Sequence, residues 1–283
     1  MDLKTIIETL PSLRLTVDAH GLMAKKTLGQ NFLLDKNITD KIVRLSMAEQ
    51  NLETYSGCHL FEVGPGPGGL TRSALSCGPS KMTVIELDER CIKIMQEIQE
   101  KTGNIMHIEN QDALKYDFSF TEELPKHILS NLPYNISVPL LTKWLYDISG
   151  YASLTLMFQK EVADRIMAPI KTKDYGRLSI LSQLQCNITR LIDLNPECFT
   201  PAPKIWSSVL LFIPLKETLT KKEISSLEKI TAQAFSMRRK MIRQSLKSYS
   251  NLEKVCSQIG ITTTMRPEEI SPQQFLELSK KLS

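Results

Sequence analysis

Seven short segments rich in apolar and β-branched residues recur through the first three quarters of the chain. Polar or turn-forming residues bound each segment, and this pattern is typical of β-strands. The predicted strands lie around Leu60–Val63, Met82–Ile85, Ile105–Ile108, His127–Leu129, Leu154–Phe158, Asn187–Ile192 and Val209–Ile213.

Helical patterns separate the early strand segments. Apolar spacing predicts one helix over Ile38–Met47, capped by Thr39 or Asp40, and another over Cys91–Ile98. Strands that alternate with helices form mostly parallel sheets. The sequence therefore predicts an α/β, Rossmann-like fold with a mostly parallel seven-stranded sheet.

The end of the pattern differs from its beginning. Residues 195–203 are rich in turn formers and leave no room for a crossover helix, so the last two strands should form an antiparallel hairpin at the sheet edge. After Pro214 an apolar helical stripe begins, which we expect to be core. The stripe contains Ile230, Ala234, Met237 and Met241, with Phe235, Ile242 and Leu246 beside it.

These patterns predict three parts: an N-terminal extension over 1–24, an α/β domain over 25–214 and a small helical domain over 215–283. The extension is expected to be either a structural element or a disordered tail.

Composition narrows the class of protein. A chain of 283 residues that is 42% hydrophobic can bury a sizeable core, and its net charge of +4 permits an RNA partner without requiring one. The six cysteines form no Cys-x-x-Cys pair, so no metal site is expected. Acidic residues near the amino end argue against a signal peptide, and no apolar run would span a bilayer. We expect a cytoplasmic monomer with no membrane association.

A glycine-rich turn, EVGPGPGG over 62–69, follows the first predicted strand. Gly64 and Gly66 permit a tight turn and close approach of a nucleotide-type cofactor. A pyrophosphate would need several backbone N–H donors here, and Pro65 and Pro67 have none. S-adenosylmethionine carries no phosphate and is the predicted cofactor, although such a turn alone is weak evidence.

Two carboxylates stand near the ends of the next two strands. Glu86 lies about 20 residues after the glycines, where a carboxylate can accept both ribose hydroxyls. Asp112 could accept a hydrogen bond from the adenine amine. Each alone could equally be a helix cap or a surface charge. With the turn, they favour a cofactor site.

The sequence NLPYN follows the fourth predicted strand. The side-chain oxygen of Asn131 and the carbonyl of Leu132 can accept from an aromatic amine such as adenine N6, because Pro133 fixes an extended backbone there. Tyr134 would stack on a base turned out of its helix. Phe158 either closes the other face of the base or belongs to the core.

With these features the chain resembles the ribosomal RNA small-subunit adenine N6,N6-dimethyltransferase family over nearly its whole length beyond the first two dozen residues. In one departure, the family usually has an aspartate where this chain has Trp206. The motifs that carry the resemblance are Leu28–Leu33, the turn at Gly64, Glu86–Asp88, Gln111–Ala113, Asn131–Ser137, Gln159–Val162, Tyr175–Ser179, Phe199–Lys204 and Arg238–Lys240.

The resemblance implies a class I methyltransferase that makes N6,N6-dimethyladenosine at two adjacent adenosines in a hairpin near the 3′ end of 16S rRNA. Its substrate would be the assembling small ribosomal subunit, and its methyl donor S-adenosylmethionine. The cofactor residues that it implies are Asn31 and Leu33 at the methionine part, Gly64 at the turn, Glu86 at the ribose, Asp112 at the adenine and Asn131 at the transfer centre.

Basic residues lie on both sides of these motifs in the sequence. On a helix, Arg239, Arg243 and Lys247 would share a face that meets phosphates without reading the base sequence. A solvated surface is the alternative for such a charge run. The predicted RNA-binding residues are Lys25, Lys26, Arg238, Arg239, Lys240, Arg243 and Lys247.

Three other functions are weighed against this one. The related methylases that modify an adenine in 23S rRNA and confer macrolide resistance usually lack the double Gly-Pro turn. A non-catalytic assembly checkpoint would not need Asn131, Tyr134 and Glu86. A nicotinamide dehydrogenase is disfavoured by Pro65 and Pro67 and by the lack of a histidine placed for proton transfer.

Overall fold

The structure is a computed structural model that describes residues 2–23, 30–118 and 124–282. It contains two compact units. The first comprises 1–143, 150–160 and 189–213, and the second comprises 144–149, 161–188 and 214–283. The second unit therefore joins two earlier segments to the helical stretch predicted from 215 onward.

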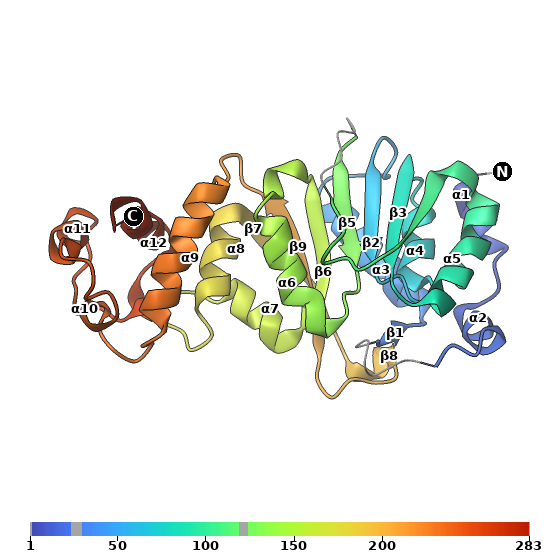
Figure 1. Cartoon of the computed structure of the whole chain (residues 1–283). Helices are drawn as coiled ribbons and strands as arrows, with labels where there is room; N and C mark the ends of the chain where they lie inside the picture. Colours follow the sequence, from blue (N-terminus) through green and yellow to red (C-terminus); the bar gives the residue numbers. More distant parts are fainter. Residues whose placement is uncertain (1, 24–29, 119–123, 283) are drawn as a thin grey trace. The chain divides into compact units, whose positions relative to one another are not determined.

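A seven-stranded sheet forms the framework of the first unit (Figure 1). The pairs β2/β3, β3/β4, β2/β5 and β5/β6 are parallel, whereas β6 and β9 are antiparallel. All seven predicted strands are present, and the mostly parallel sheet with an antiparallel edge is confirmed. In sheet order the strands are β4 (Met106–Asn110), β3 (Lys81–Glu86), β2 (His59–Val63), β5 (Lys126–Ser130), β6 (Ser153–Gln159), β9 (Ser207–Pro214) and β7 (Cys186–Leu194).

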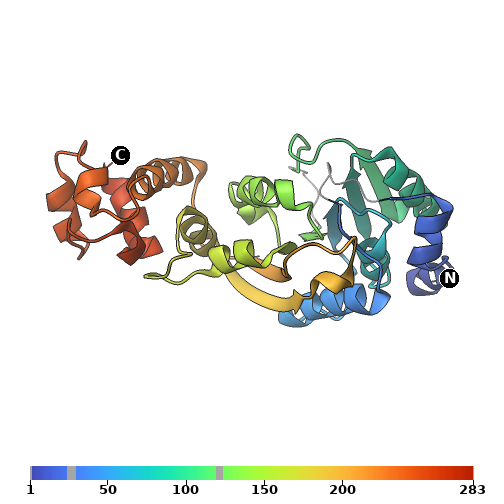
Figure 2. The same cartoon turned by 90° about the horizontal axis from the view of Figure 1, so that it is seen from below.

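Helices on both faces explain why the central strands are continuous apolar runs. Every residue of β2 and β5 is buried. Figure 2 shows α3 (Lys36–Glu49) and α6 (Tyr134–Leu145) on opposite faces of the sheet. The crossover helices α4 (Gly69–Leu75) and α5 (Glu89–Thr102) follow β2 and β3. The carboxyl ends of the parallel strands therefore meet at one edge, where α/β folds bind ligands.

The first turn of α3 corrects one prediction. Asp35 is the N-cap, because its carboxylate accepts a hydrogen bond from the Asn37 N–H at 2.8 Å. Thr39 and Asp40, the predicted caps, lie inside the helix. Five of the six residues from 35 to 40 are polar, and the apolar pattern placed the helix start about one turn too late.

The N-terminal residues are structural. They form α1 (Leu3–Glu8) and α2 (Leu13–Ala19) and bury Ile7, Leu13 and Leu22. Arg72 on α4 donates hydrogen bonds to the Pro11 carbonyl at 2.5 Å and to the Thr16 hydroxyl at 3.1 Å. The segment 2–23 therefore packs as part of the first unit.

Helices make up most of the second unit. Helix α9 packs on α12, and α12 also contacts α8. One expectation was wrong: α9 ends at Phe235, and Met237 and Met241 are 48% and 37% exposed rather than core. The helices are α7 (Lys160–Met167), α8 (Arg177–Gln185), α9 (Lys221–Phe235), α10 (Ile242–Ser245), α11 (Leu252–Gln258) and α12 (Pro272–Leu282).

A candidate methyl-donor and target-base site

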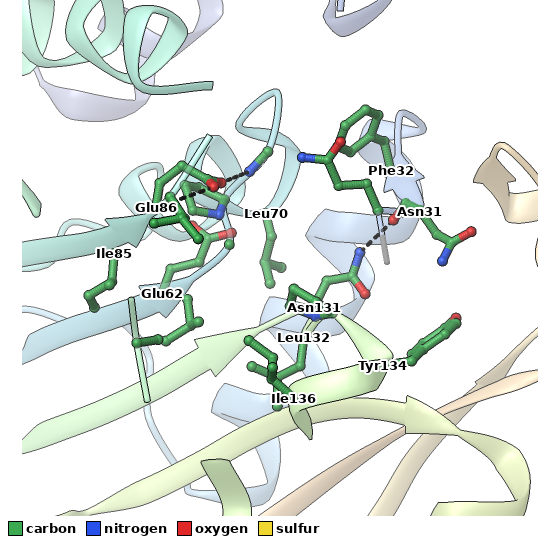
Figure 3. A pocket seen from close by; sticks show the side chains of 18 of the residues that line it. Asn31, Phe32, Glu62, Leu70, Ile85, Glu86, Asn131, Leu132, Tyr134 and Ile136 are labelled. Carbon is green, nitrogen blue, oxygen red and sulfur yellow. Dashed lines mark hydrogen bonds between the residues drawn. The ribbon is translucent and has the colours of Figure 1, made fainter. Parts of the chain in front are cut away.

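A cavity of about 250 Å³ opens at the carboxyl ends of β2, β3 and β5. The glycine turn, the two strand-end carboxylates and the NLPYN segment all line it. Figure 3 shows Asn131 between the carboxylates of Glu62 and Glu86 on one side and Tyr134 on the other. The sequence motifs that were predicted to act together therefore meet in one cavity.

The glycine turn is held by close backbone packing. Gly64 has a φ of +69°, and a side chain there would lie 3.3 Å from the Pro133 ring. A Cβ at Gly69 would lie 2.5 Å from the Leu33 carbonyl oxygen. Gly66 directs its N–H to the Glu86 carboxylate at 3.4 Å, and Pro65 and Pro67 have no N–H. Few donors remain for a phosphate, so the turn fits a cofactor without one.

Glu86 is a fixed, buried carboxylate. Its Oε1 accepts hydrogen bonds from the N–H groups of Leu87 at 2.7 Å and Asp88 at 2.8 Å. Burial raises the pKa of Glu86, while these hydrogen bonds act in the opposite direction. The backbone thus orients the carboxylate toward the cavity, where it can accept from the hydroxyls of a ribose.

Asp88, which donates its N–H to Glu86, is itself held by hydrogen bonds. Asp88 caps α5 and is only 5% exposed, and Arg90 pairs with its Oδ2 at 2.6 Å. The hydrogen bonds from Arg90 hold the pKa of Asp88 well below its usual range. Gln30 donates to the same carboxylate at 3.1 Å. This network fixes the strand end that presents Glu86.

The loop that carries Asp112 forms another wall of the cavity. Asp112 accepts a hydrogen bond from the Leu114 N–H at 2.9 Å. From α6, the Lys143 ammonium donates to the carbonyls of Ala113 at 3.2 Å, Leu114 at 2.8 Å and Tyr116 at 2.6 Å. One cation therefore ties this loop to the helix that begins at Tyr134.

Directly after β5, the side chain of Asn131 is oriented by a backbone carbonyl. Its Nδ2 donates to the Asn31 carbonyl at 3.0 Å, so the amide oxygen is the other, unconstrained end of the group. Leu132 and Pro133 line the cavity beside it. The Tyr134 hydroxyl bonds to the Ser207 hydroxyl at 2.6 Å, which fixes the ring at the cavity rim. The arrangement offers a planar aromatic amine an acceptor and an aromatic face.

Comparison with known proteins agrees with this geometry. The sequence model described as ribosomal RNA adenine dimethylase matches residues 21–283. The chain belongs to the ribosomal RNA adenine dimethylase family. The methyl donor of this family is S-adenosylmethionine. The carboxylates of the site fit that molecule, and so does the turn, because it offers few N–H donors to a phosphate.

Several relatives are similar over nearly their whole length. The ribosomal RNA small subunit methyltransferase A of Rhodospirillum rubrum is 42% identical over 271 residues, which cover 96% of this chain and 92% of that protein. Its counterpart in Cereibacter sphaeroides is 44% identical over 282 residues, which cover 98% and 99%. These matches support the dimethylase assignment along the whole chain.

Solved structures show the same fold. A dimethyladenosine transferase from Plasmodium falciparum has a TM-score of 0.72 at 24% identity, over 86% of this chain and 94% of its own. The 23S rRNA methyltransferase ErmE has a TM-score of 0.64 at 22% identity, over 89% and 99%. The predicted class I methyltransferase fold is confirmed.

One residue predicted for the dimethylase site does not reach it. Phe158 on β6 is fully buried and meets Phe212 of β9 edge to face, with ring centroids 6.2 Å apart. It is a core residue, and the expectation that it closes the base pocket was wrong. Side chains alternate between the faces of a strand, and Phe158 points to the packed face rather than into the cavity.

Glu62 is a cavity residue that sequence reasoning missed. It lies at the end of β2, is 1% exposed and accepts a hydrogen bond from the Thr71 hydroxyl at 2.6 Å. Burial raises its pKa to about 8, the Thr71 bond opposes this, and Glu86 adds to it. A carboxylate inside an apolar strand, directly before a glycine turn, was the signal that could have identified it.

The predicted RNA-binding residues of the dimethylase fall into three groups. Lys25 and Lys26 lie outside the described residues. Arg238 donates to Glu268 at 3.3 Å and to the Thr172 carbonyl at 3.0 Å, so it holds the second unit together. The exposed members are Arg239, Lys240, Arg243 and Lys247. They do not share one helical face as predicted, because the chain is not helical between α9 and α10.

Within the part of the chain that the structure describes, no three His, Cys, Asp or Glu side chains are grouped as metal ligands. None of the described helices has the length and apolar character needed to cross a bilayer.

Proposed function

We propose that this protein transfers methyl groups from S-adenosylmethionine to N6 of two adjacent adenosines in a hairpin near the 3′ end of 16S rRNA. The product is N6,N6-dimethyladenosine, and the substrate is the assembling small ribosomal subunit. One observation carries the proposal: the amide of Asn131 is fixed by the Asn31 carbonyl beside a carboxylate-lined cavity suited to the methyl donor.

The proposed chemistry requires positioning more than acid or base catalysis. When bound, S-adenosylmethionine supplies an electrophilic methyl group on a sulfonium. The adenine amine nitrogen forms the new N–CH3 bond while the S–CH3 bond breaks, its electron pair stays on sulfur, and the amine proton leaves to solvent. The Asn131 oxygen and the Leu132 carbonyl accept from the amine, which makes its lone pair more available for attack.

An aromatic ring in the site can hold an adenosine that has been turned out of its helix. Tyr134 lies at the cavity rim with its hydroxyl anchored by Ser207, so its ring is available as a stacking surface. Because the amine is held by acceptors and not enclosed by donors, a monomethylated nitrogen can return for the second transfer with one N–H still to donate.

For RNA binding we propose the exposed cations Arg239, Lys240, Arg243 and Lys247, together with Lys25 and Lys26, as phosphate contacts. Arg238 contributes indirectly by bracing Glu268. In this proposal residues 215–283 form the core of an RNA-binding domain, and the protein acts as a cytoplasmic monomer.

The experiment is to incubate the protein with unmethylated small subunits and labelled S-adenosylmethionine, and to map the label by nuclease digestion and mass spectrometry. Dimethyladenosine at two neighbouring 16S positions is the expected result. A second reaction contains large subunits. Label in their 23S rRNA would instead place the chain with the resistance methylases. Tight subunit binding without any label would reveal a checkpoint protein.

A further inference from the structure

Trp206 is a large aromatic residue that the described part of the protein leaves open. It is 48% exposed, and no described aromatic ring stacks on its indole. The other tryptophan, Trp144, is 1% exposed. A half-exposed indole presents a large, flat apolar face to the solvent, on which another ring can stack.

The backbone of Trp206 is fixed. Its carbonyl accepts a hydrogen bond from the Lys160 N–H at 2.8 Å, and the next residue, Ser207, begins β9 in register with Gln159 of β6. Ser207 is fully buried. The indole is therefore attached to a backbone position that is already fixed before any ligand arrives.

Two contacts tie the segment that carries Trp206 to residues that line the cavity. The preceding short strand β8 (Phe199–Thr200) pairs with β1 (Phe32–Leu33), so Phe199 lies opposite Leu33, which lines the cavity. At its other end, Ser207 bonds to the hydroxyl of Tyr134, which also lines it. The segment from Phe199 to Ser207 thus connects a residue paired with Leu33 to a residue bonded to Tyr134. It is the link between β8 and β9 in Figure 1.

Cationic side chains lie on the segment that carries Trp206 and on the elements next to it. The segment Phe199–Ser207 contains one ionisable side chain, Lys204, which is exposed. Close by in the fold, Lys160 and Arg190 both approach Asp193, each with an N–O distance of 3.7 Å. One carboxylate is thus shared by two cations, and it also accepts from the Ser208 hydroxyl at 2.6 Å. Lys204 thus places one exposed ammonium group two residues from the indole, where it can meet a phosphate of a nucleic-acid backbone.

We infer that Trp206 forms a second stacking site, which binds an unpaired nucleobase next to the adenosine held at Tyr134. This rests on the proposed function. Turning the target base out of the helix leaves its neighbour without a stacking partner, and an exposed aromatic ring beside the pocket can replace that partner. The base is recognised by its flat face, so the site places the strand without reading its sequence.

The test compares Trp206→Phe, Trp206→Leu and Trp206→Ala in the full-length protein, with unmethylated small subunits as substrate. Aromatic–base stacking predicts that kcat/KM falls roughly tenfold in the Ala and Leu variants and less than about threefold in the Phe variant. S-adenosylmethionine affinity, measured by calorimetry, and Tm should match the wild type. Leu15→Ala, which removes an apolar side chain that is 62% exposed on α2, is the matched control.

Every outcome is decisive. If the wild type does not methylate small subunits, the proposed function fails and the inference fails with it. If the wild type is active and the Ala variant has the same kcat/KM, only the stacking site is refuted. Equal activity of the Leu and Phe variants would indicate an apolar contact with a ribosomal protein instead of a base. Weakened cofactor binding or a lowered Tm in the Ala variant would mean that Trp206 is structural.

Discussion

The side-chain amide of Asn131 donates a hydrogen bond to the backbone carbonyl of Asn31 at 3.0 Å. The two residues are 100 positions apart, and both line the cavity. A carbonyl can only accept, so it selects the orientation of the amide in which the nitrogen faces Asn31. The amide oxygen is then the end of the side chain that can face a ligand in the cavity, and this contact joins the segment before β1 to the segment after β5.

This contact predicts the effect of two substitutions at Asn131. Asn131→Ala removes the proposed acceptor, and kcat should fall at least about a hundredfold because the amine is no longer held for attack. Asn131→Asp sets a carboxylate oxygen against the Asn31 carbonyl, and the repulsion should displace it. The measurement is single-turnover methylation of unmethylated small subunits. Full transfer by the Ala variant with normal cofactor affinity would contradict the role of Asn131.

Glu62 predicts a pH dependence of stability. Burial raises its pKa to about 8 from 4.5, so the folded protein holds this proton more tightly than the unfolded chain. The stabilisation is complete below pH 4.5 and is lost as the pH rises toward 8. Without cofactor, the unfolding free energy of the wild type should therefore fall relative to Glu62→Gln between pH 5 and pH 8.5, by more than about 1 kcal/mol. Urea unfolding at several pH values measures this difference.

Two comparisons make the Glu62 result specific. The Gln variant leaves Glu86 and the other titrating groups in place, so most of their contributions cancel in the difference. Thr71→Val removes the hydroxyl that bonds to the Glu62 carboxylate at 2.6 Å and should deepen the loss at high pH. Parallel pH profiles for wild type and Glu62→Gln would show that the carboxyl titrates normally in the folded state.

Gly69 predicts a steric effect on the turn. A methyl group there would lie 2.5 Å from the Leu33 carbonyl oxygen, so the backbone of β1 or α4 must move. Gly69→Ala should destabilise the protein by about 1–3 kcal/mol and weaken cofactor binding, because Leu33 lines the cavity. The control is Gly150→Ala, where nothing lies within 4 Å and φ is not in the left-handed range. Thermal unfolding that gave the two variants equal Tm values would refute the close approach.

The sheet, and the meeting of most of the predicted site residues in one cavity, could be predicted because their signals are local. Apolar runs mark the strands, and in a parallel sheet their carboxyl ends must meet, which brings Glu86, Asp112 and Asn131 together. Glu62 was missed because its main partner, Thr71, belongs to the next helix, and strand patterning treats a lone buried carboxylate as an exception. The sequence also did not show whether the Phe158 side chain points into the core or into the cavity.

The prediction of one continuous basic helix was wrong because of contacts between residues that are distant in sequence. The apolar spacing of Ile230 and Ala234 continues past Ser236, but the backbone does not follow it. The N–H of Ile242 donates to the Met265 carbonyl, and that of Arg243 to the Thr263 carbonyl. These partners lie 20 or more residues away in sequence, so tertiary hydrogen bonds replace the helical ones that periodicity predicts.

Lys143 does not line the cavity, but we predict that it affects the affinity for the cofactor. Its ammonium holds the carbonyls of Ala113, Leu114 and Tyr116, and it lies 5.3 Å from the centre of the Phe118 ring. Burial lowers its pKa, and it is held by acceptors. Hydrogen bonds to charged groups contribute about 1.5–3 kcal/mol each, so Lys143→Met should release the loop that carries Asp112.

We expect Lys143→Met to weaken S-adenosylmethionine binding roughly tenfold, because part of the loop's ordering must then accompany binding. Maximal methylation at saturating cofactor should change less than about threefold, since Asn131 and Tyr134 are untouched. Lys41→Met, at an exposed position on α3, is the matched control. Calorimetric titration with the cofactor gives the affinity, and hydrogen exchange of residues 112–118 reports the loop. An unchanged affinity together with faster exchange would separate loop order from cofactor binding and refute the positioning role.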